Sequence, residues 1–359
     1  MPPQAFSFFN YTPMLSTDEH YMQRAIAIAR AANGNNAPNP RVGAVLVYNN
    51  RIIGEGYHQQ YGQAHAEVNA VASVAPADRP FLPQSTMYVT LEPCFHQGKT
   101  PPCVQLILQE QIARVVIACQ DPFEKVAGQS IALLKERGVE VVVGVLEQEA
   151  AHLARRFFTT VKKKRPYVLL KYAQTKDGFI GKPEERVLIS NAFSQRLVHQ
   201  WRRQEAAILV GTNTALLDNP SLTNRFWRGR QPLRLVIDKQ LRLPRDLKLF
   251  DGQHPTWVFT TQNNPPVWKN VHFVTLQENN TFLEQLLAYL YQEKIQSLLV
   301  EGGAELLSSF ITAGCWEEAR VLESPITLER GVKAPELPPS SYHHSNSLLD
   351  NTLSYYYTT

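Results

Sequence analysis

Hydrophobic and polar residues in the first part of the chain follow two different periods, which predict helices and strands in alternation. A capping sequence at Ser16 begins a periodic helix that runs to Ala32, and a loop over 33–41 follows. The next expected elements are a hairpin of strands Val42–Tyr48 and Ile52–Gly56, helix His65–Val74, strand Thr86–Leu91, helix Cys103–Gln111, strand Arg114–Ala118, a helix, and strand Val139–Val145. This order is typical of an α/β domain with a largely parallel sheet that closes near residue 146.

The alternation begins again after Pro166. The expected elements are strand Tyr167–Tyr172, helix Ala192–Glu205, strands Ala207–Gly211, Leu233–Asp238 and Thr256–Thr260, helix Thr281–Glu293, strand Ser297–Glu301 and helix Glu305–Ala313. Beyond these only Leu353–Tyr357 resembles a strand, so no final pair of strong strands is expected. Because 359 residues exceed one typical domain, we expect a tail (1–17), a first domain (18–146), a connecting helix (147–165) and a second α/β domain (166–359).

The overall composition is that of an ordinary globular protein, with 44% hydrophobic and 19% charged residues. A formal charge of +4 suits small anionic substrates but is too small for a nucleic-acid-binding surface. The sequence has neither a signal-peptide pattern nor an apolar run of membrane-spanning length. Cys119 and Cys315 are expected to be core thiols rather than a disulfide, which favours a reducing compartment, the cytoplasm.

One imidazole and two thiols form the strongest chemical motif of the chain. His65, Cys94 and Cys103 offer three zinc ligands and leave a fourth position for water, as in catalytic zinc sites. Glu67 is not needed as a ligand, so its carboxylate can move the protons of the zinc-bound water. Residues i and i+2 of a regular helix face apart, so His65 and Glu67 can only face one site if they lie at the first turn of a helix. The order H-x-E…P-C…C is the signature of zinc nucleobase deaminases, although eight residues rather than two separate these cysteines.

Three segments together resemble the bifunctional deaminase/reductase family of bacterial riboflavin biosynthesis: Pro38–Gly43, His65-Ala66-Glu67, and Thr90–Cys94 with Gly98–Cys103. The resemblance implies a cytidine-deaminase-like, three-layer α/β domain followed by a dihydrofolate-reductase-like domain. It also implies one Zn²⁺ per chain and NADPH as cofactors. The expected partner is a phosphorylated pyrimidine substrate, without nucleic acid or membrane, and the expected assembly is a homo-oligomer.

The resemblance assigns roles in the first domain residue by residue. Glu67 is expected to be the catalytic acid and base, and zinc to be held by His65, Cys94 and Cys103. The substrate is expected to contact Asn39, His58, His96 and Lys99, with Lys99 facing its phosphate. Taken alone, His58 and His96 could equally be surface or capping histidines, and His96 is a rival zinc ligand that we set aside because the family uses two thiolates.

In the second domain no G-x-G-x-x-G motif supports a Rossmann fold, and the strongest feature is the strand, double glycine and helix around Gly302-Gly303. Taken alone, this could be a tight turn; in the family it is the cofactor's pyrophosphate loop. The residues expected to contact NADPH are Ala173, Leu188, Thr214, Asp218, Gly303, Ala304, Glu305, Leu306, Leu307, Ser308 and Ser309. Those expected to face the substrate are Lys171, Arg186, Arg202, Leu222, Arg225 and Glu301, with a solvated helix face as the alternative for Arg202.

The segment Phe179–Val187 departs from the family pattern because it is shorter. Arg186 and Leu188 stand where the family has a substrate-binding serine and a cofactor-stacking tryptophan. These changes leave an alternative open, a deaminase whose C-terminal domain is an inactive reductase or an oligomerisation module. Another alternative, a deaminase of free nucleosides, bases or nucleic acid, is disfavoured by Lys99, the modest charge and the fused second domain.

Overall fold

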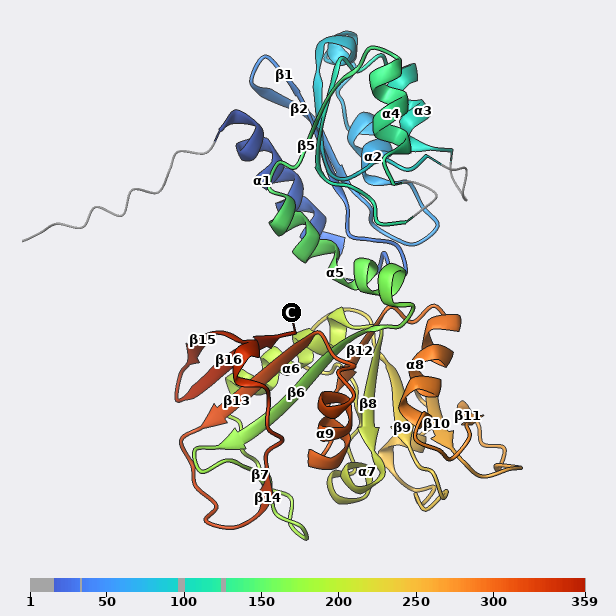
Figure 1. Ribbon diagram of the computed structural model, residues 1–359, viewed down its shortest axis with the longest axis vertical. Helices are drawn as coiled ribbons and strands as arrows, with labels where there is room; N and C mark the ends of the chain where they lie inside the picture. Colours follow the sequence, from blue (N-terminus) through green and yellow to red (C-terminus); the bar gives the residue numbers. More distant parts are fainter. Residues whose placement is uncertain (1–15, 33, 96–100, 124–126, 359) are drawn as a thin grey trace, which may run out of the picture. The chain divides into compact units, whose positions relative to one another are not determined.

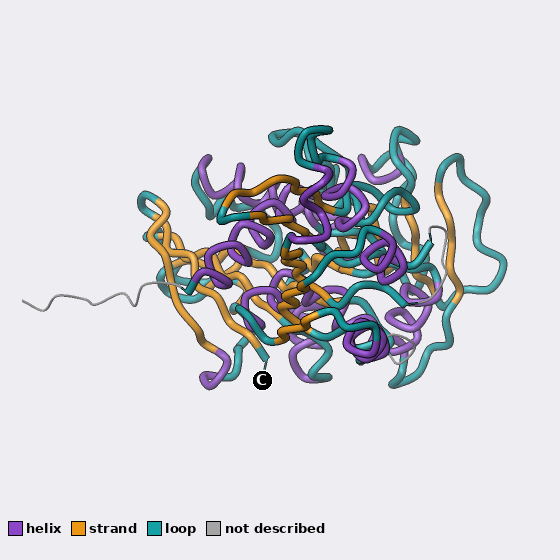
Figure 2. Tube along the Cα trace, turned by 90° about the horizontal axis from the view of Figure 1, so that it is seen from above, coloured by secondary structure: helices purple, strands orange, loops and turns teal. Residues whose placement is uncertain are grey.

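The computed structural model describes residues 16–32, 34–95, 101–123 and 127–358. The chain forms two compact units, one of Met1–Ala32 and Arg41–Leu153, the other of Asn33–Pro40 and Ala154–Thr359. Both units contain strands and helices (Figure 2), and these alternate along the chain (Figure 1). The sequence placed 33–40 in the first domain, but this segment groups with the second unit. There Arg230 donates to Gly34 O at 3.1 Å and Gln296 donates to Pro38 O at 2.7 Å.

Among the described residues of the first unit, five strands form a sheet in the order β2-β1-β3-β4-β5. β1 pairs antiparallel with β2 and β3, whereas β3, β4 and β5 run parallel. The strands are β1 (Gly43–Tyr48), β2 (Arg51–Tyr57), β3 (Thr86–Leu91), β4 (Arg114–Cys119) and β5 (Glu140–Val143). The helices are α1 (Thr17–Ala29), which continues as the 3-10 turn η1 (Arg30–Ala32), α2 (Ala66–Ala72), α3 (Cys103–Gln109), α4 (Gln129–Glu136) and the 3-10 helix η2 (Arg79–Gln84).

Helices cover both faces of this sheet, with α1 on one side and α2, α3 and α4 on the other (Figure 1). Ala44 and Leu46 of β1 belong to the core cluster that includes Ala70 of α2. Gly43 faces α1 so closely that a Cβ on it would lie 2.1 Å from Ala25 O. The predicted three-layer α/β arrangement is therefore confirmed.

In the described part of the second unit, nine strands form a sheet in the order β11-β10-β9-β8-β12-β6-β13-β16-β15. Strands β11 to β13 of this order run parallel, and β16 and β15 are antiparallel. The strands are β6 (Tyr167–Thr175), β8 (Ala207–Gly211), β9 (Leu233–Ile237), β10 (Thr256–Thr260), β11 (Val271–Thr275), β12 (Ser297–Val300), β13 (Glu318–Ser324), β15 (Tyr342–Leu348) and β16 (Asn351–Tyr357). A small separate sheet pairs β7 (Phe179–Gly181) with β14 (Val332–Lys333).

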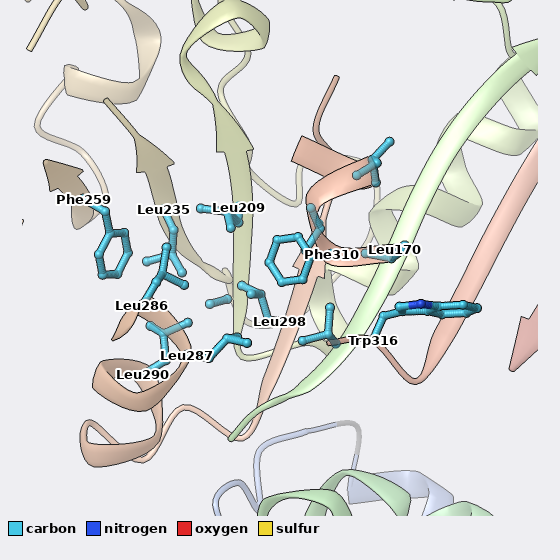
Figure 3. Packing of buried hydrophobic residues seen from close by; sticks show 14 of the residues in the cluster. Leu170, Leu209, Leu235, Phe259, Leu286, Leu287, Leu290, Leu298, Phe310 and Trp316 are labelled. Carbon is cyan, nitrogen blue, oxygen red and sulfur yellow. The ribbon is translucent and has the colours of Figure 1, made fainter. Parts of the chain in front are cut away.

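The second sheet is also covered on both faces. The helices are α5 (Glu147–Lys163), which begins in the first unit, α6 (Ala192–Gln204), α7 (Thr212–Asp218), α8 (Phe282–Gln292), α9 (Ala304–Thr312) and the 3-10 helices η3 (Lys248–Phe250) and η4 (Pro339–Ser341). Leu286 of α8 and Phe310 of α9 pack on Leu209 and Leu298 of the central strands (Figure 3). On the opposite face, Trp201 of α6 joins Ile208 and Leu299. Helices on both faces therefore bury the parallel strands at the centre of the sheet.

The end of the chain contradicts the expectation that no strong pair of strands closes it. β15 and β16 form a hairpin, and β16 also pairs with β13. The sequence missed β15 because it is an edge strand whose residues are mostly exposed, so it lacks the alternation of apolar residues that predicts a strand. β11, β13 and α7 were also missed. None of the helices in the described residues combines the length and apolarity that a membrane crossing requires.

Candidate functional site

In the first unit His65, Cys94 and Cys103 bring their ligand atoms within 4.8 Å of one another. Nδ1 of His65 lies 3.5 Å from Sγ of Cys94 and 3.4 Å from Sγ of Cys103. His65 is the extended N-cap of α2, Cys103 is the first residue of α3, and Cys94 follows the end of β3. Three donor atoms of the kinds that zinc prefers therefore converge from three separate elements.

The thiols of Cys94 and Cys103 interact with each other, and their pKa values shift in opposite directions. Hydrogen bonds from Cys103, whose N–H lies 3.2 Å from the sulfur, hold the pKa of Cys94 below its ordinary value despite burial. The neighbouring Cys94 and burial raise the pKa of the Cys103 thiol. Binding of a divalent cation would require both thiols to be deprotonated. This donor set fits zinc.

Glu67 lies beside the three ligands, as the second residue of α2. Only 3% of the residue is exposed, and burial, reinforced by the Cys94 thiolate, raises the pKa of its carboxyl to about 7. A carboxyl group with a pKa near the working pH can both accept and return a proton. Glu67 therefore lies in the first turn of α2, as the spacing of His65 and Glu67 requires.

The other residues expected at the deaminase site divide into three groups. His58 is 2% exposed, its Nδ1 lies 3.0 Å from Ala64 O, and its ring centre lies 5.2 Å from that of His65. Burial lowers the pKa of His58, so a neutral imidazole adjoins the ligands and a surface role is excluded. Asn39 belongs to the segment that groups with the second unit, where its carbonyl accepts a bond from Asn36. His96 and Lys99 lie outside the described residues.

The second unit contains a cavity of about 1120 Å³ beside the carboxyl ends of β8, β9 and β12. Ligands of open α/β sheets bind at this edge. Many residues expected to bind cofactor or substrate line it: Lys171, Ala173, Arg186, Leu188, Thr214, Asp218, Glu301, Gly303, Ala304, Glu305, Leu306 and Ser309. The structure therefore brings together residues of β6, α7 and α9 and the residue after β12, up to 138 positions apart in the sequence (171 to 309).

The Gly302-Gly303 turn fits a phosphate group. Gly303 is the N-cap of α9 and makes no side-chain cap, so the first N–H groups of the helix are available to an anion. A Cβ on Gly303 would lie only 3.3 Å from Thr214 Oγ1, so any side chain there would narrow the space between α9 and α7. This cradle is consistent with the pyrophosphate of NADPH.

The charged residues Lys171 and Glu301 line this cavity, and Arg202 does not line it but contacts Glu301. Arg202 forms a two-pronged ion pair with Glu301, with Nε–Oε1 and Nη2–Oε2 distances of 2.9 and 2.8 Å. Although burial alone would raise the pKa of Glu301, the Arg202 guanidinium lowers it to about 2. Burial lowers the pKa of Lys171, while Glu301 opposes that shift. Arg202 is thus held by a carboxylate and does not lie on a solvated helix face.

Some expected residues do not line the cavity. Leu222 is 2% exposed and adopts a left-handed φ of +52°, a strained backbone conformation. Arg225 follows it closely, and its N–H donates to Nδ1 of His199 at 3.1 Å. Leu307 is fully buried in the core, and Ser308 does not border the cavity. Ligand contacts of these residues stay predictions.

The cavity residues that sequence reasoning missed include two cations, Lys239 and Arg242, in the segment after β9. Their position after a predicted parallel strand was a usable signal, because strand ends form the binding edge of such sheets. Arg186 and Leu188, the two residues that depart from the family pattern, also line the cavity. Arg186 reaches Asp218 with an Nε–Oδ1 distance of 3.8 Å, and Leu188 is 67% exposed.

Comparison with known proteins agrees with this arrangement. The family model of the cytidine and deoxycytidylate deaminase zinc-binding region matches residues 15–119, and that of the RibD C-terminal domain matches residues 166–340. The riboflavin biosynthesis protein RibD of Bacillus amyloliquefaciens is 39% identical over 329 residues, covering 89% of this chain and 87% of its own. RibD of Aquifex aeolicus is 37% identical, covering 91% and 92%.

Solved structures give the same result for the whole chain. The crystal structure of a diaminohydroxyphosphoribosylaminopyrimidine deaminase/5-amino-6-(5-phosphoribosylamino)uracil reductase from Thermotoga maritima superposes with a TM-score of 0.87 at 34% identity. That alignment covers 96% of this chain and 99% of the other. Acinetobacter baumannii RibD superposes with a TM-score of 0.85 at 31% identity. With a zinc-ligand cluster in one unit and a cofactor-sized cavity in the other, the chain belongs to the RibD family of riboflavin biosynthesis proteins.

Proposed function

We propose that the protein catalyses two successive steps of riboflavin biosynthesis. The first is the hydrolytic deamination of 2,5-diamino-6-(5-phosphoribosylamino)pyrimidin-4(3H)-one, and the second is the NADPH-dependent reduction of the ribosyl group to ribityl. The observation that supports the first step most strongly is the convergence of His65, Cys94 and Cys103 beside the buried Glu67. For the second step it is the cavity between Gly303, Lys171 and Glu301.

In the deamination, water adds to the ring carbon that bears the amino group, and ammonia leaves. A zinc ion held by His65, Cys94 and Cys103 supplies a Lewis acid that lowers the pKa of water toward neutrality. Glu67 takes the proton of the attacking water and returns it to the ring nitrogen and the leaving amine. Burial of Glu67 suits this cycle because it keeps both protonation states accessible near pH 7. His58, neutral and beside His65, is positioned to contact the substrate.

In the reduction, NADPH supplies the hydride. The N-terminus of α9 at Gly303 binds the cofactor's pyrophosphate, and Glu301 faces the substrate from the adjacent strand end. Reduction also requires a proton, which Lys171 can donate because it lines the same cavity and interacts with Glu301. Arg202 holds the carboxylate of Glu301 ionised and oriented.

The proposal extends to partners and organisation. The substrate is a phosphorylated pyrimidine, Lys99 contacts its phosphate, and nucleic acid is not a substrate. The deaminase domain spans 18–146, the reductase domain 166–359, and residues 147–165 connect them. The chain forms a homo-oligomer. Four free cysteines fit the reducing conditions of the cytoplasm, where we place the enzyme.

A coupled assay tests both steps on the full chain. Zinc content is measured by elemental analysis, ammonia release is followed with the diaminopyrimidinone phosphate, and NADPH oxidation is followed in the same reaction. One zinc per chain, ammonia release without NADPH, and NADPH oxidation only after deamination are expected. Ammonia release without any NADPH oxidation or NADPH-induced quenching of tryptophan fluorescence would instead support the alternative of a deaminase with a non-catalytic second domain.

A further inference from the structure

The carboxylate of Glu92 is buried but takes no part in the chemistry proposed above. Only 3% of this residue is exposed, and four backbone N–H groups of the described residues donate to it. Oε2 accepts from Asp121 at 3.3 Å and Gly128 at 2.9 Å, whereas Oε1 accepts from Ser130 at 3.2 Å and Ile131 at 3.4 Å. All the donors lie 29 to 39 residues further along the chain.

These bonds make Glu92 the cap of a distant helix. Gly128 is the N-cap of α4 but has no side chain to cap it, and Ser130 and Ile131 are the second and third residues of the helix. Their N–H groups are the ones that an N-cap side chain ordinarily satisfies. Here a carboxylate from the end of β3 does so, and its charge also suits the positive end of the helix.

The same residue stands two positions before the zinc ligand Cys94. Between them lies Pro93, whose ring fixes the backbone φ angle. On the other side of Cys94 the chain is tied to α3, because Val104 N–H donates to Cys94 O at 3.3 Å and Cys103 N–H donates to Cys94 Sγ at 3.2 Å. The peptide that carries the sulfur is thus held at both ends, to α4 through Glu92 and to α3 directly.

We propose that Glu92 is a positioning residue for the zinc site: by capping α4 it fixes the peptide that carries the Cys94 thiolate. This inference rests on the zinc site of the proposed function. Glu92 differs from an ordinary helix cap because the structure it fixes includes a ligand only two residues away. Residues that do not bind the metal but orient its ligands typically contribute a factor of about 10–100 to metal affinity.

The substitution Glu92→Gln tests the role with little change of shape. Every partner of the carboxylate is an N–H donor, so the amide nitrogen of glutamine would face two donors whichever way it turned. Glu92→Asp keeps the charge and two acceptor oxygens but withdraws them by one methylene. We therefore expect zinc affinity to decrease in the order wild type, Glu92→Asp, Glu92→Gln. For Glu92→Gln the zinc dissociation constant should rise about 10–100-fold.

Asp18→Asn provides the matched control. Asp18 is a partly buried carboxylate of the same unit that pairs with Arg114 at 2.8 Å and accepts from Tyr88, away from the ligands in the sequence. Zinc affinity of the full-length protein is measured by competition with a chelator of known affinity, and thermal unfolding is measured in parallel. Cobalt(II) substitution reports thiolate ligation independently, through its charge-transfer absorption.

The results separate the possible roles. Weaker zinc binding and an altered cobalt spectrum in Glu92→Gln, with Asp18→Asn losing thermal stability only, would support the proposal. Wild-type zinc affinity and cobalt spectrum in Glu92→Gln or, if that variant does not fold, in Glu92→Asp would overturn it and leave Glu92 a structural cap. Failure of the wild-type protein to bind zinc would refute the proposed function itself.

Discussion

The guanidinium of Arg202 and the carboxylate of Glu301 form a two-pronged ion pair in which both side chains are about nine-tenths buried, with relative exposures of 12% and 11%. Arg202 also donates to Thr223 O at 3.1 Å, so it connects α6 both to the residue after β12 and to the loop after α7. Because Glu301 lines the cavity, this pair belongs to the structure of the reductase site as well as to its chemistry.

Arg202→Met should lower the free energy of unfolding by about 3–5 kcal/mol, because it leaves the buried carboxylate of Glu301 without a counter-charge. The double variant Arg202→Met/Glu301→Gln should recover most of that loss without recovering NADPH oxidation. Urea denaturation measures the free energy of unfolding, and the coupled assay measures NADPH oxidation. Equal destabilisation of the single and double variants would contradict this account of the pair.

Glu67→Gln should abolish ammonia release while the protein keeps its zinc. The amide cannot accept the proton of the attacking water, so we expect kcat to fall by at least about 10²–10⁴-fold. The measurements are ammonia release and zinc content of the same sample. Glu55→Gln is the control, since Glu55 is a partly exposed carboxylate of the same unit paired with Arg24. A Glu67→Gln enzyme with normal turnover would show that another group moves the protons.

Gly303→Ala should weaken NADPH binding because its methyl group would lie 3.3 Å from Thr214 Oγ1, inside the cradle between α9 and α7. Loss of one hydrogen bond to the pyrophosphate corresponds to a rise of up to about tenfold in Kd. Gly211→Ala is the matched control, since a Cβ there would meet Leu306 at an ordinary contact distance of 3.9 Å. Tryptophan fluorescence titration with NADPH compares the two variants, and equal affinities would argue against a phosphate cradle at Gly303.

His199 should make stability depend on pH in mildly acidic solution. Burial, together with Arg202 and Arg225, lowers its pKa from 6.5 to about 4, so the unfolded chain binds more protons than the folded one between these values. The stabilising contribution is therefore complete above about pH 6.5 and is lost as the pH falls toward 4.

His199→Asn isolates this effect. Its side-chain oxygen can replace Nδ1 as acceptor for the N–H of Arg225 but cannot become charged. Denaturant unfolding from pH 7 to pH 4 should give a smaller decline in stability for the variant than for the wild type. Parallel declines in the two proteins would assign the pH dependence to other groups.

The zinc site could be predicted because its information is local in the sequence. His65 and Glu67 are neighbours, and the two cysteines flank one loop, so residue type and order suffice. Glu92 belongs to the same motif but was passed over, because its four donors in 121–131 can be identified only when the strand end and α4 are placed in space.

The reductase half was harder to predict for physical reasons. Its cavity is lined by residues within β6 and by residues at or just after the ends of β8, β9 and β12. The spacing of residues in the sequence does not reveal which of these strands lie side by side in the sheet. The resemblance identified part of the lining, whereas other lining residues, Lys239 and Arg242 among them, were found only in the structure. Similarly, the polar edge strand β15 is held by pairing with β16 rather than by an apolar face, so its residues gave no signal.

The path of segment 33–40 bears on how the two halves of this enzyme could be separated. The chain crosses between the units after residues 32, 40 and 153, so one cut in α5 would not release two complete bodies. A gene split there would leave Gly34 and Pro38 on the first fragment, while their donors Arg230 and Gln296 would lie on the second. A second half that begins in α5 would therefore lack the segment whose carbonyl groups accept hydrogen bonds from Arg230 and Gln296.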